Sequence, residues 1–393
     1  MYNLIKGDKI MSTRFILNEF SYFGRGSRAE LVPEITKRGF KNVFLVTDAA
    51  LVKCGVVNKV TKLLDEAKIN YTIYSDVKPN PTIANVMNGL KECKDFNTDL
   101  ILTIGGGSAM DTAKGISILM TNPDRTMESL CGLSNTANKG LPIIAMPTTA
   151  GTASEVTINY VITNEATQVK MVCVDPNDLP IVAIVDSELM ETMPASLAAA
   201  TGLDALTHAV EGYITKGANL MSDMFHMEAI KLIFANLTNA VKGDKDAIEK
   251  MSYAQYIAGM GFSNVGLGIV HSMAHQLGAV YDTPHGIANA MLLPVVMEFN
   301  GSVCARRFRE ILSGIGVNVS NLSDEEVVAR FVKEIEDLSA SVGVTQTIKD
   351  YGCKEEDIPM LAQKAYEDPC APGNPRDTTL TEFIELYHIA LNR

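Results

Sequence analysis

The stretch "LILTIGGGSAMDTAKGISIL" (Leu100–Leu119) decides the fold of the first half of the chain. An apolar strand is predicted to lead into three glycines, Gly105 to Gly107, and a helix to open at Ser108. Glycines let the backbone approach a ligand closely, and amides at a helix N-terminus favour an anion such as a pyrophosphate. A plain strand-to-helix turn is the simpler interpretation, but three consecutive glycines exceed what a turn needs. The stretch therefore favours phosphate binding, although it contains neither GxGxxG nor GK[ST].

Similar strand signals recur on both sides of this stretch. Amphipathic segments such as "VVNKVTKLLDEAK" and "IANVMNGLKECKDF" separate them. Near-continuous apolar strands that alternate with helices are typical of a parallel sheet covered on both faces. The predicted strands are 41–48, 70–77, 98–107, 141–149 and 180–186.

Beyond about residue 190 the pattern changes to three-to-four periodicity, which predicts helices. Such segments include "SLAAATGLDALTHAVEGYI", "LMSDMFHMEAIKLIFANLTNAV" and "EEVVARFVKEIEDLSASVG". The chain has 393 residues, whereas single hydrophobic cores stop growing beyond about 250–300 residues. We therefore predict a Rossmann-like α/β domain over 1–192 and an all-α domain over 193–393.

Composition excludes several classes of partner. A formal net charge of -12 argues against nucleic acid or an anionic membrane as the main partner. No apolar run approaches the roughly eighteen residues of a membrane span, and no signal-peptide core is visible at the start. Seven scattered cysteines without a CxxC pair indicate reduced thiols. These features predict a cytoplasmic protein.

Two further features follow predicted strands. Asp48 ends the strand "NVFLVTD", where a carboxylate could accept from a ribose hydroxyl and repel a 2′-phosphate, although such an Asp is often only a turn residue. "PTTAGTASEVTINYVIT" (Pro147–Thr163) is crowded with hydroxyls and small residues and is interpreted as a loop suited to hydrogen bonding with a nucleotide. Ser/Thr/Gly loops are, however, common in proteins of every kind.

Scarce histidines gather in the second half with one aspartate. Asp204 and His208 are four apart, so both project from one helix face, and His271 and His275 have the same spacing. His285 follows "YDTP", a turn signal, so a loop or a helix start is expected there.

Imidazole and carboxylate ligands without thiolate suit a first-row divalent ion, iron(II) or zinc. Spacing alone does not decide which of these five residues bind the ion, and any single histidine could instead be structural. His226 and His388 lie in ordinary amphipathic segments and are interpreted as structural.

With these motifs the chain resembles the group III iron-containing alcohol dehydrogenase family. The resemblance runs nearly end to end through "IGGGSAMDTAKGI", "GLDALTHAVEGYIT", "IAGMGFSNVGLGIVHSMAHQLGAVYDTPHGIANAMLLP" and "GNPRD". The third of these motifs is highly specific for the family. Departures are modest, at Gln276 and at Ala371–Pro372 beside Cys370.

Carried over by position, the resemblance assigns roles to individual residues. The metal ligands fall on Asp204, His208, His271 and His285, whereas His275 stands beside the nicotinamide and the substrate as a candidate proton relay. Phe262 and Cys370 are expected to line the substrate pocket. The nucleotide contacts fall on Asp48, Asn80, Gly106, Gly107, Ser108, Thr148, Thr149, Asn159 and Lys170.

The resemblance also implies an activity, cofactors and an assembly. It implies NAD(H)-dependent interconversion of short-chain aldehydes and primary alcohols with Fe²⁺, or with Zn²⁺ as the alternative ion. Lactaldehyde reduction to 1,2-propanediol is the expected reaction. A homodimer paired through Phe15–Asn18 is expected. The alternatives are a butanol, 1,3-propanediol or glycerol dehydrogenase, a lyase of the dehydroquinate synthase type, and a metal-binding protein without catalysis. The glycine turn argues against the last of these.

Overall fold

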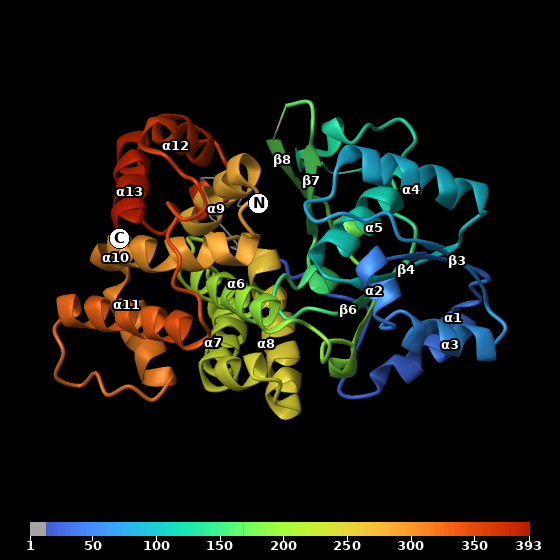
Figure 1. Cartoon of the computed structure of the whole chain (residues 1–393), viewed down its shortest axis with the longest axis horizontal. Coiled ribbons are helices and arrows are strands. Elements are labelled where there is room, and N and C mark those ends of the chain that lie inside the picture. The colour runs from blue at the N-terminus through green and yellow to red at the C-terminus, as the bar shows by residue number, and fades with distance from the viewer. Residues whose placement is uncertain (1–12, 135, 168) are drawn as a thin grey trace, which may run out of the picture.

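Two halves lie side by side in this computed structural model, which describes residues 13–134, 136–167 and 169–393. One half is built on a parallel sheet and the other consists of helices (Figure 1). The predicted fold class, a Rossmann-like α/β domain followed by an all-α domain, is confirmed.

Six strands form the large sheet in the order β1-β9-β6-β4-β2-β3, and every neighbouring pair is parallel. All five predicted strands belong to it. β1 (Phe20–Phe23) is an additional edge strand, too short to show a period in the sequence. The other five are β2 (Asn42–Val46), β3 (Asn70–Tyr74), β4 (Leu100–Gly105), β6 (Ile143–Pro147) and β9 (Val182–Val185).

Helices cover both faces of this sheet, which explains why its strands are apolar throughout. In β2, Val43 and Leu45 enter one core with α1 and α3, whereas Phe44 and Val46 enter the other with α4 and α5. Alternate side chains of a strand point to opposite faces, so both sets must be apolar. The helices are α1 (Leu31–Arg38), α2 (Ala49–Lys53), α3 (Asn58–Glu66), α4 (Ile83–Asp95) and α5 (Gly107–Thr121).

A second, three-stranded sheet corrects part of the loop prediction for Pro147–Thr163. Residues 148–158 contain no strand, but β7 (Asn159–Asn164) pairs antiparallel with β8 (Val169–Val174), and β5 (Gly132–Leu133) pairs with β8. Tyr160 and Ile162 alternate into the core, a period-two signal that the hydroxyl-rich composition around it obscures.

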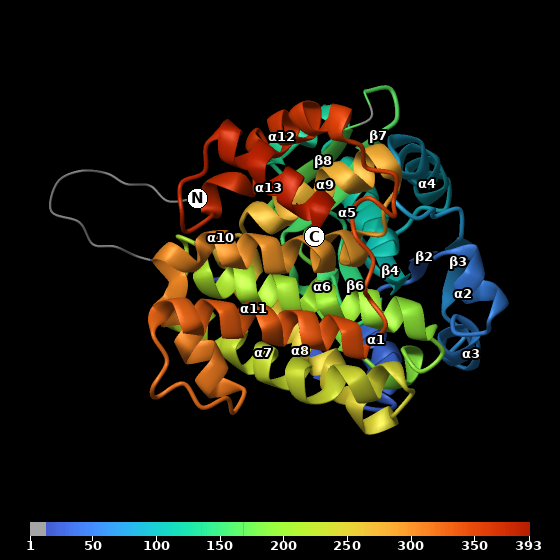
Figure 2. The same ribbon diagram turned by 60° about the vertical axis from the view of Figure 1, so that its left-hand side comes forward.

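The helical half stacks long helices against one another (Figure 2). Residues 195–392, all within the described part of the chain, form helices and connections only. The α-helices are α6 (Ala195–Ile214), α7 (Leu220–Val241), α8 (Lys245–Val265), α9 (Ile269–Tyr281), α10 (His285–Gly314), α11 (Asp324–Ser341), α12 (Ile358–Tyr366) and α13 (Leu380–Asn392). Short 3-10 helices are η1 (Ser27–Glu30), η2 (Glu128–Leu130), η3 (Ser154–Val156), η4 (Pro176–Asp178), η5 (Ser187–Leu189), η6 (Glu355–Asp357) and η7 (Ala371–Gly373).

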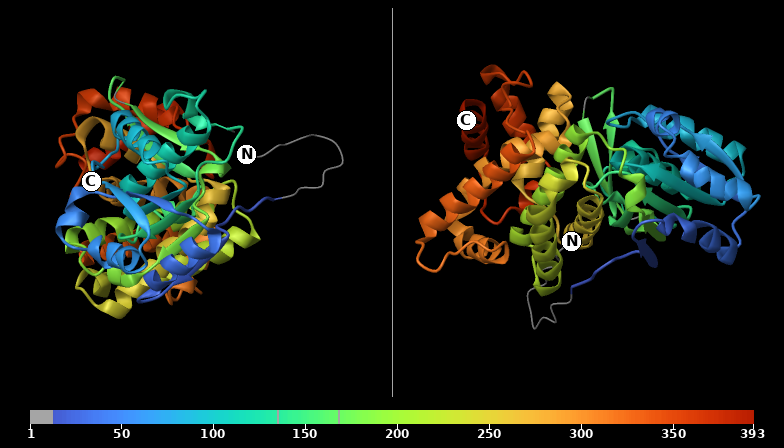
Figure 3. Two further views of the ribbon diagram at one scale, coloured as in Figure 1. Left: turned by 90° about the vertical axis from the view of Figure 1, so that its right-hand side faces the viewer. Right: turned by 60° about the horizontal axis from the view of Figure 1, so that its bottom comes forward.

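The proposed domain boundary at 192/193 falls between η5 and α6. The segment before β1 also crosses this boundary, because it extends from the sheet to the helical half (Figure 3). There the Asn264 side chain hydrogen-bonds both the N–H and the C=O of Ile16. By length and composition α10 could cross a membrane, but 67% of its most apolar window is buried in the molecule, as in a core helix.

Candidate metal centre and cofactor cleft

A cleft with an empty volume of about 900 Å³ lies where the two halves meet. Its walls come from the C-terminal edge of the large sheet, from β7 and β8, and from the helices that carry the clustered histidines. The predicted site residues that line it are Asn80, Gly107, Ser108, Asn159, Lys170, Asp204, His208, Phe262, His271, His275, His285 and Cys370.

Three helices bring the four expected metal ligands together. Asp204 and His208 lie on α6, His271 lies in the first turn of α9, and His285 is the first residue of α10. Each offers one ligand atom, and these four atoms all lie within 4.8 Å of one another. The structure thereby separates His275 from the set that spacing alone had left open.

Three of these ligands converge on one point. Asn289 Nδ2 lies 2.7 Å from Asp204 Oδ1, 3.2 Å from His271 Nε2 and 3.3 Å from His285 Nε2. An amide has two hydrogens for these three acceptors. The acceptors therefore surround a position that suits a cation better than it suits an amide.

Further observations agree with a cation at this point. His208 Nδ1 is buried without a hydrogen-bond partner among the described residues, which is costly unless something binds it. Burial lowers the pKa of His208, takes that of His271 well below its usual range, and lowers that of His285 to about 3. All three imidazoles are therefore neutral, the form that binds a metal. The residues present thus fit a first-row divalent ion.

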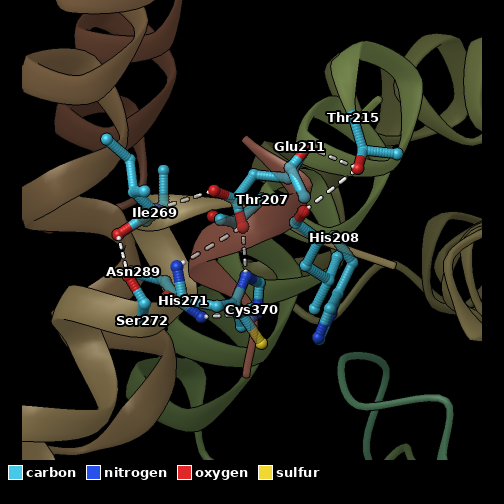
Figure 4. Close-up of polar contacts among 12 residues, drawn as sticks. Thr207, His208, Glu211, Thr215, Ile269, His271, Ser272, Asn289 and Cys370 are labelled. Carbon is cyan, nitrogen blue, oxygen red and sulfur yellow. Dashed lines mark hydrogen bonds and ion pairs between the residues drawn. The ribbon is translucent and has the colours of Figure 1, made fainter. Parts of the chain in front are cut away.

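Glu211 on α6 contacts His271 on the ring nitrogen that points away from the other proposed ligands (Figure 4). Its Oε2 lies 2.6 Å from His271 Nδ1, and its Oε1 accepts from the amide of Val270 at 2.7 Å. Burial raises the pKa of Glu211 to about 8, opposed by backbone amides that donate to it. A cation on His271 would favour the ionised carboxylate. Its spacing of three and seven residues from His208 and Asp204 was a signal that we missed.

His275 has a carboxylate partner of its own. Its Nδ1 lies 2.8 Å from Asp368 Oδ2, on the turn between α12 and α13. A carboxylate on Nδ1 fixes the tautomer and turns Nε2 away from Asp368. No local signal identifies Asp368, because it is 93 residues away in the chain.

Phe262 forms a rigid wall of the cleft. Its ring stacks on His208 with centroids 4.2 Å apart, and it is 3% exposed. It therefore both fixes the imidazole and limits the space beside it.

Four expected nucleotide contacts lie at the sheet edge outside the lining of this cleft. Asp48, Gly106, and Thr148 with Thr149 follow β2, β4 and β6, which are neighbours in the sheet. Asp48 Oδ1 accepts from the amide of Leu51 at 2.9 Å and caps α2, which uses one carboxylate oxygen. Ligands of open α/β sheets bind at this edge.

Gly106 and Gly107 are needed because the backbone passes close to neighbouring side chains, and not because of a positive φ angle. A Cβ on Gly106 would lie 3.1 Å from the Thr149 side chain, and one on Gly107 would lie 2.9 Å from that of Thr152. Among the residues that the structure describes, no side chain caps α5, whose N-cap is Gly106, so its first amides can receive an anion. These residues fit a dinucleotide phosphate.

A polar bridge spans the cleft between the halves. Lys170 Nζ donates to Asn80 Oδ1 at 2.8 Å, and Asn80 Nδ2 donates to Asp282 Oδ1 at 2.7 Å. Asp282, which ends α9 in the helical half, was not predicted. Asn80 and Asp282 both have left-handed backbone conformations, with φ of 53° and 52°. Such conformations in non-glycine residues cluster at functional sites.

Comparisons with known proteins show which family the chain is similar to. A model described as "Iron-containing alcohol dehydrogenase" matches residues 18–187, and one described as "Fe-containing alcohol dehydrogenase family, C-terminal" matches 198–391. The lactaldehyde reductase of Escherichia coli strain K12 is 51% identical over 97% of this chain and 100% of its own length. The NAD-dependent methanol dehydrogenase of Bacillus methanolicus is 40% identical over 96% and 100%. A crystal structure of a 1,3-propanediol oxidoreductase superposes with a TM-score of 0.94 at 41% identity, over 97% and 100%.

Proposed function

The chain belongs to the iron-containing alcohol dehydrogenase family, and from that premise we propose that it reduces lactaldehyde to 1,2-propanediol with NADH. The observation that carries this proposal is the single cleft that combines four convergent ligands, His275, and an uncapped helix N-terminus. A metal-binding protein without catalysis would need neither of the last two features.

Two groups of residues would bind the metal ion and the dinucleotide. Asp204, His208, His271 and His285 would hold Fe²⁺ or Zn²⁺, and Gly107, Ser108, Asn80 and Lys170 would hold the dinucleotide. When bound, the ion supplies Lewis-acid polarisation of the carbonyl, and NADH supplies the hydride. The protein contributes orientation and a mostly buried set of donors, three neutral imidazoles and one carboxylate.

His275 is placed to pass the proton. Asp368 accepts from its Nδ1–H, so Nε2 is the atom available to the cleft. In the reducing direction His275 would first take a proton from solvent at Nε2 and then give it to the product oxygen, which returns the ring to its neutral form. Asp368 would stabilise the positive imidazole in the other direction by holding its remaining N–H.

For the cofactor we favour NAD over NADP, because Asp48 follows β2 at the edge where the ribose would lie. The name of the Bacillus methanolicus relative supports the same choice. Zinc outcompetes iron(II) at such a site in general, so the purified protein can carry either ion.

The substrate preference follows from the walls of the cleft. Phe262 is fixed by its stacking on His208 and cannot move aside for a bulky substrate. Each added methylene changes binding by only about 1–3 kcal/mol, so neighbouring short aldehydes should also react. Bulky aromatic aldehydes should be rejected between Phe262 and the turn after α12 that carries Cys370. 1,3-Propanediol chemistry is the second candidate, because the superposed structure bears that name.

A panel of aldehydes assayed with NADH and added Fe²⁺ or Zn²⁺ tests the proposal. We expect the highest kcat/KM with lactaldehyde and measurable rates with other aldehydes of two to four carbons. If 3-hydroxypropionaldehyde or butyraldehyde exceeds lactaldehyde by about tenfold, the substrate is wrong while the dehydrogenase stands. If no aldehyde oxidises NADH, the dehydrogenase proposal itself fails.

We also propose a homodimer and a cytoplasmic location. Asn264 holds the N–H and C=O of Ile16, so those of Leu17 point the opposite way in an extended chain. Leu17 is 40% exposed and could pair with a second copy. All seven cysteines are free thiols, as expected in a reducing compartment.

A further inference from the structure

Three side chains on the helical side of the cleft form a second group with metal-binding chemistry. His275, Asp368 and Cys370 each offer one donor atom, and these atoms all lie within 4.8 Å of one another. His275 comes from α9, and the other two come from the turn after α12. None of them belongs to the four-ligand set described above.

We propose that this group binds a second, soft divalent cation such as Zn²⁺ or Cd²⁺, and that occupancy inhibits the enzyme. A thiolate beside an imidazole and a carboxylate selects soft ions, unlike the sulfur-free set on α6, α9 and α10. Three protein ligands with one open position are typical of zinc sites that keep a water molecule.

The surrounding contacts hold the donors in place and leave an entry path. Asp368 Oδ1 accepts from the amide of Cys370 at 2.9 Å, so one carboxylate oxygen fixes the turn while Oδ2 faces His275. His275 and Asp368 are buried, yet His275 and Cys370 both line the open cleft. An ion could therefore reach donors that are already assembled.

Binding would interrupt the proton path. The Cys370 thiol would lose its proton to solvent, and the imidazole proton of His275 would move from Nδ1 to Nε2. The ion would replace the hydrogen bond between His275 and Asp368. His275 could then no longer accept a proton at Nε2, so turnover should stop.

The test uses protein loaded with one equivalent of Zn²⁺ and titrated with Cd²⁺. Because the first site contains no sulfur, a thiolate-to-metal charge-transfer absorption reports only on cysteine. We expect one such site per chain, a total of two ions by elemental analysis, and a loss of activity that follows the absorption.

Two sets of variants decide between this site and adventitious thiols. Cys370→Ser should remove the absorption. Because even an outer partner of a ligand contributes about 10- to 100-fold, removing the charge of a direct ligand in Asp368→Asn should keep the absorption but require at least about 10-fold more Cd²⁺. Replacing the two exposed cysteines, Cys54 and Cys131, with serine should change neither the absorption nor the activity. Absorption that survives Cys370→Ser, or that disappears with the exposed cysteines, would overturn the proposal. An unchanged Cd²⁺ requirement in Asp368→Asn would do the same.

Discussion

At the residue scale, Glu211 shows how one carboxylate can orient a proposed metal ligand. It holds His271 through Nδ1 and also accepts from the amide that begins the same turn. We predict that Glu211→Gln lowers metal affinity by about 10- to 100-fold, because an outer partner that orients a ligand typically contributes that much. Glu310→Gln is the matched control, since Glu310 accepts from Tyr213 and not from a site residue. Titration with Fe²⁺ or Zn²⁺, followed by elemental analysis, measures the difference, and equal affinities would exclude this role.

Asp48 is the residue on which we expect cofactor choice to depend. We predict that the natural protein prefers NADH and that Asp48→Gly raises kcat/KM with NADPH, because removing the carboxylate removes its repulsion of a 2′-phosphate. The variant also removes the cap of α2, but glycine at an N-cap costs only a few tenths of a kcal/mol. The measurement is kcat/KM with both cofactors for both proteins. A natural preference for NADPH, or no gain in the variant, would show that Asp48 is not the determinant.

At the scale of elements, α6, α7 and α8 meet around one buried imidazole. His226 of α7 is completely buried, and neither ring nitrogen has a partner among the described residues. It fits only because Gly212 of α6 and Gly261 of α8 face it: a Cβ at either position would lie 2.3 or 2.2 Å from Nε2. Glycine inside these helices, which normally weakens a helix, is therefore explained by packing.

The burial of His226 makes the stability of the protein depend on pH. Burial lowers the pKa of His226 to about 3 from its ordinary 6.5. The unfolded chain takes up this proton at higher pH than the folded chain, so the contribution is complete above about pH 6.5 and is lost as pH falls toward 3. We predict that His226 lowers the free energy of unfolding by about 3 kcal/mol between pH 7 and pH 4, at about 1.4 kcal/mol per pH unit.

Urea unfolding across this pH range checks the prediction. His226→Leu should reduce the slope of the pH dependence by about 1.4 kcal/mol per pH unit, because leucine fills the space without titrating, while the other buried histidines keep their share. His388→Leu, at a partly exposed position on α13, should leave the dependence as it is. Parallel curves for the natural protein and the His226 variant would contradict the prediction.

At the scale of the whole molecule, we predict that the segment before β1 pairs two copies of the chain. Leu17 N–H has no partner among the residues that the structure describes, so Leu17→Pro removes only a group that a second copy would need. We predict a dimer for the natural protein and a monomer for Leu17→Pro by light scattering at micromolar concentration. Asn264→Ala, which frees Ile16 instead, should weaken but not abolish the dimer. A monomeric natural protein would end the dimer hypothesis.

The sequence by itself determined the elements and the local pairs of site residues. Apolar runs and three-to-four periodicity are local properties, so β4, α5 and the long helices were predictable, as was the common face of Asp204 and His208. β1, β5, β7 and β8 were not predicted: β1 and β5 are too short to show a period, and the hydroxyl-rich sequence around β7 masked its period-two pattern. A spacing of four residues, however, could not separate His275 from the ligands.

Only the tertiary structure decided which groups complete the site. Glu211 meets His271 across 60 residues, Asn289 meets Asp204 across 85, and Asp368 meets His275 across 93. No residue near these positions in the chain signals such contacts, because they arise when separate helices pack and bring their buried polar faces together. A buried polar atom needs a hydrogen-bond partner, and packing decides which distant residue supplies it. The order of residues in the chain does not show which residue that is.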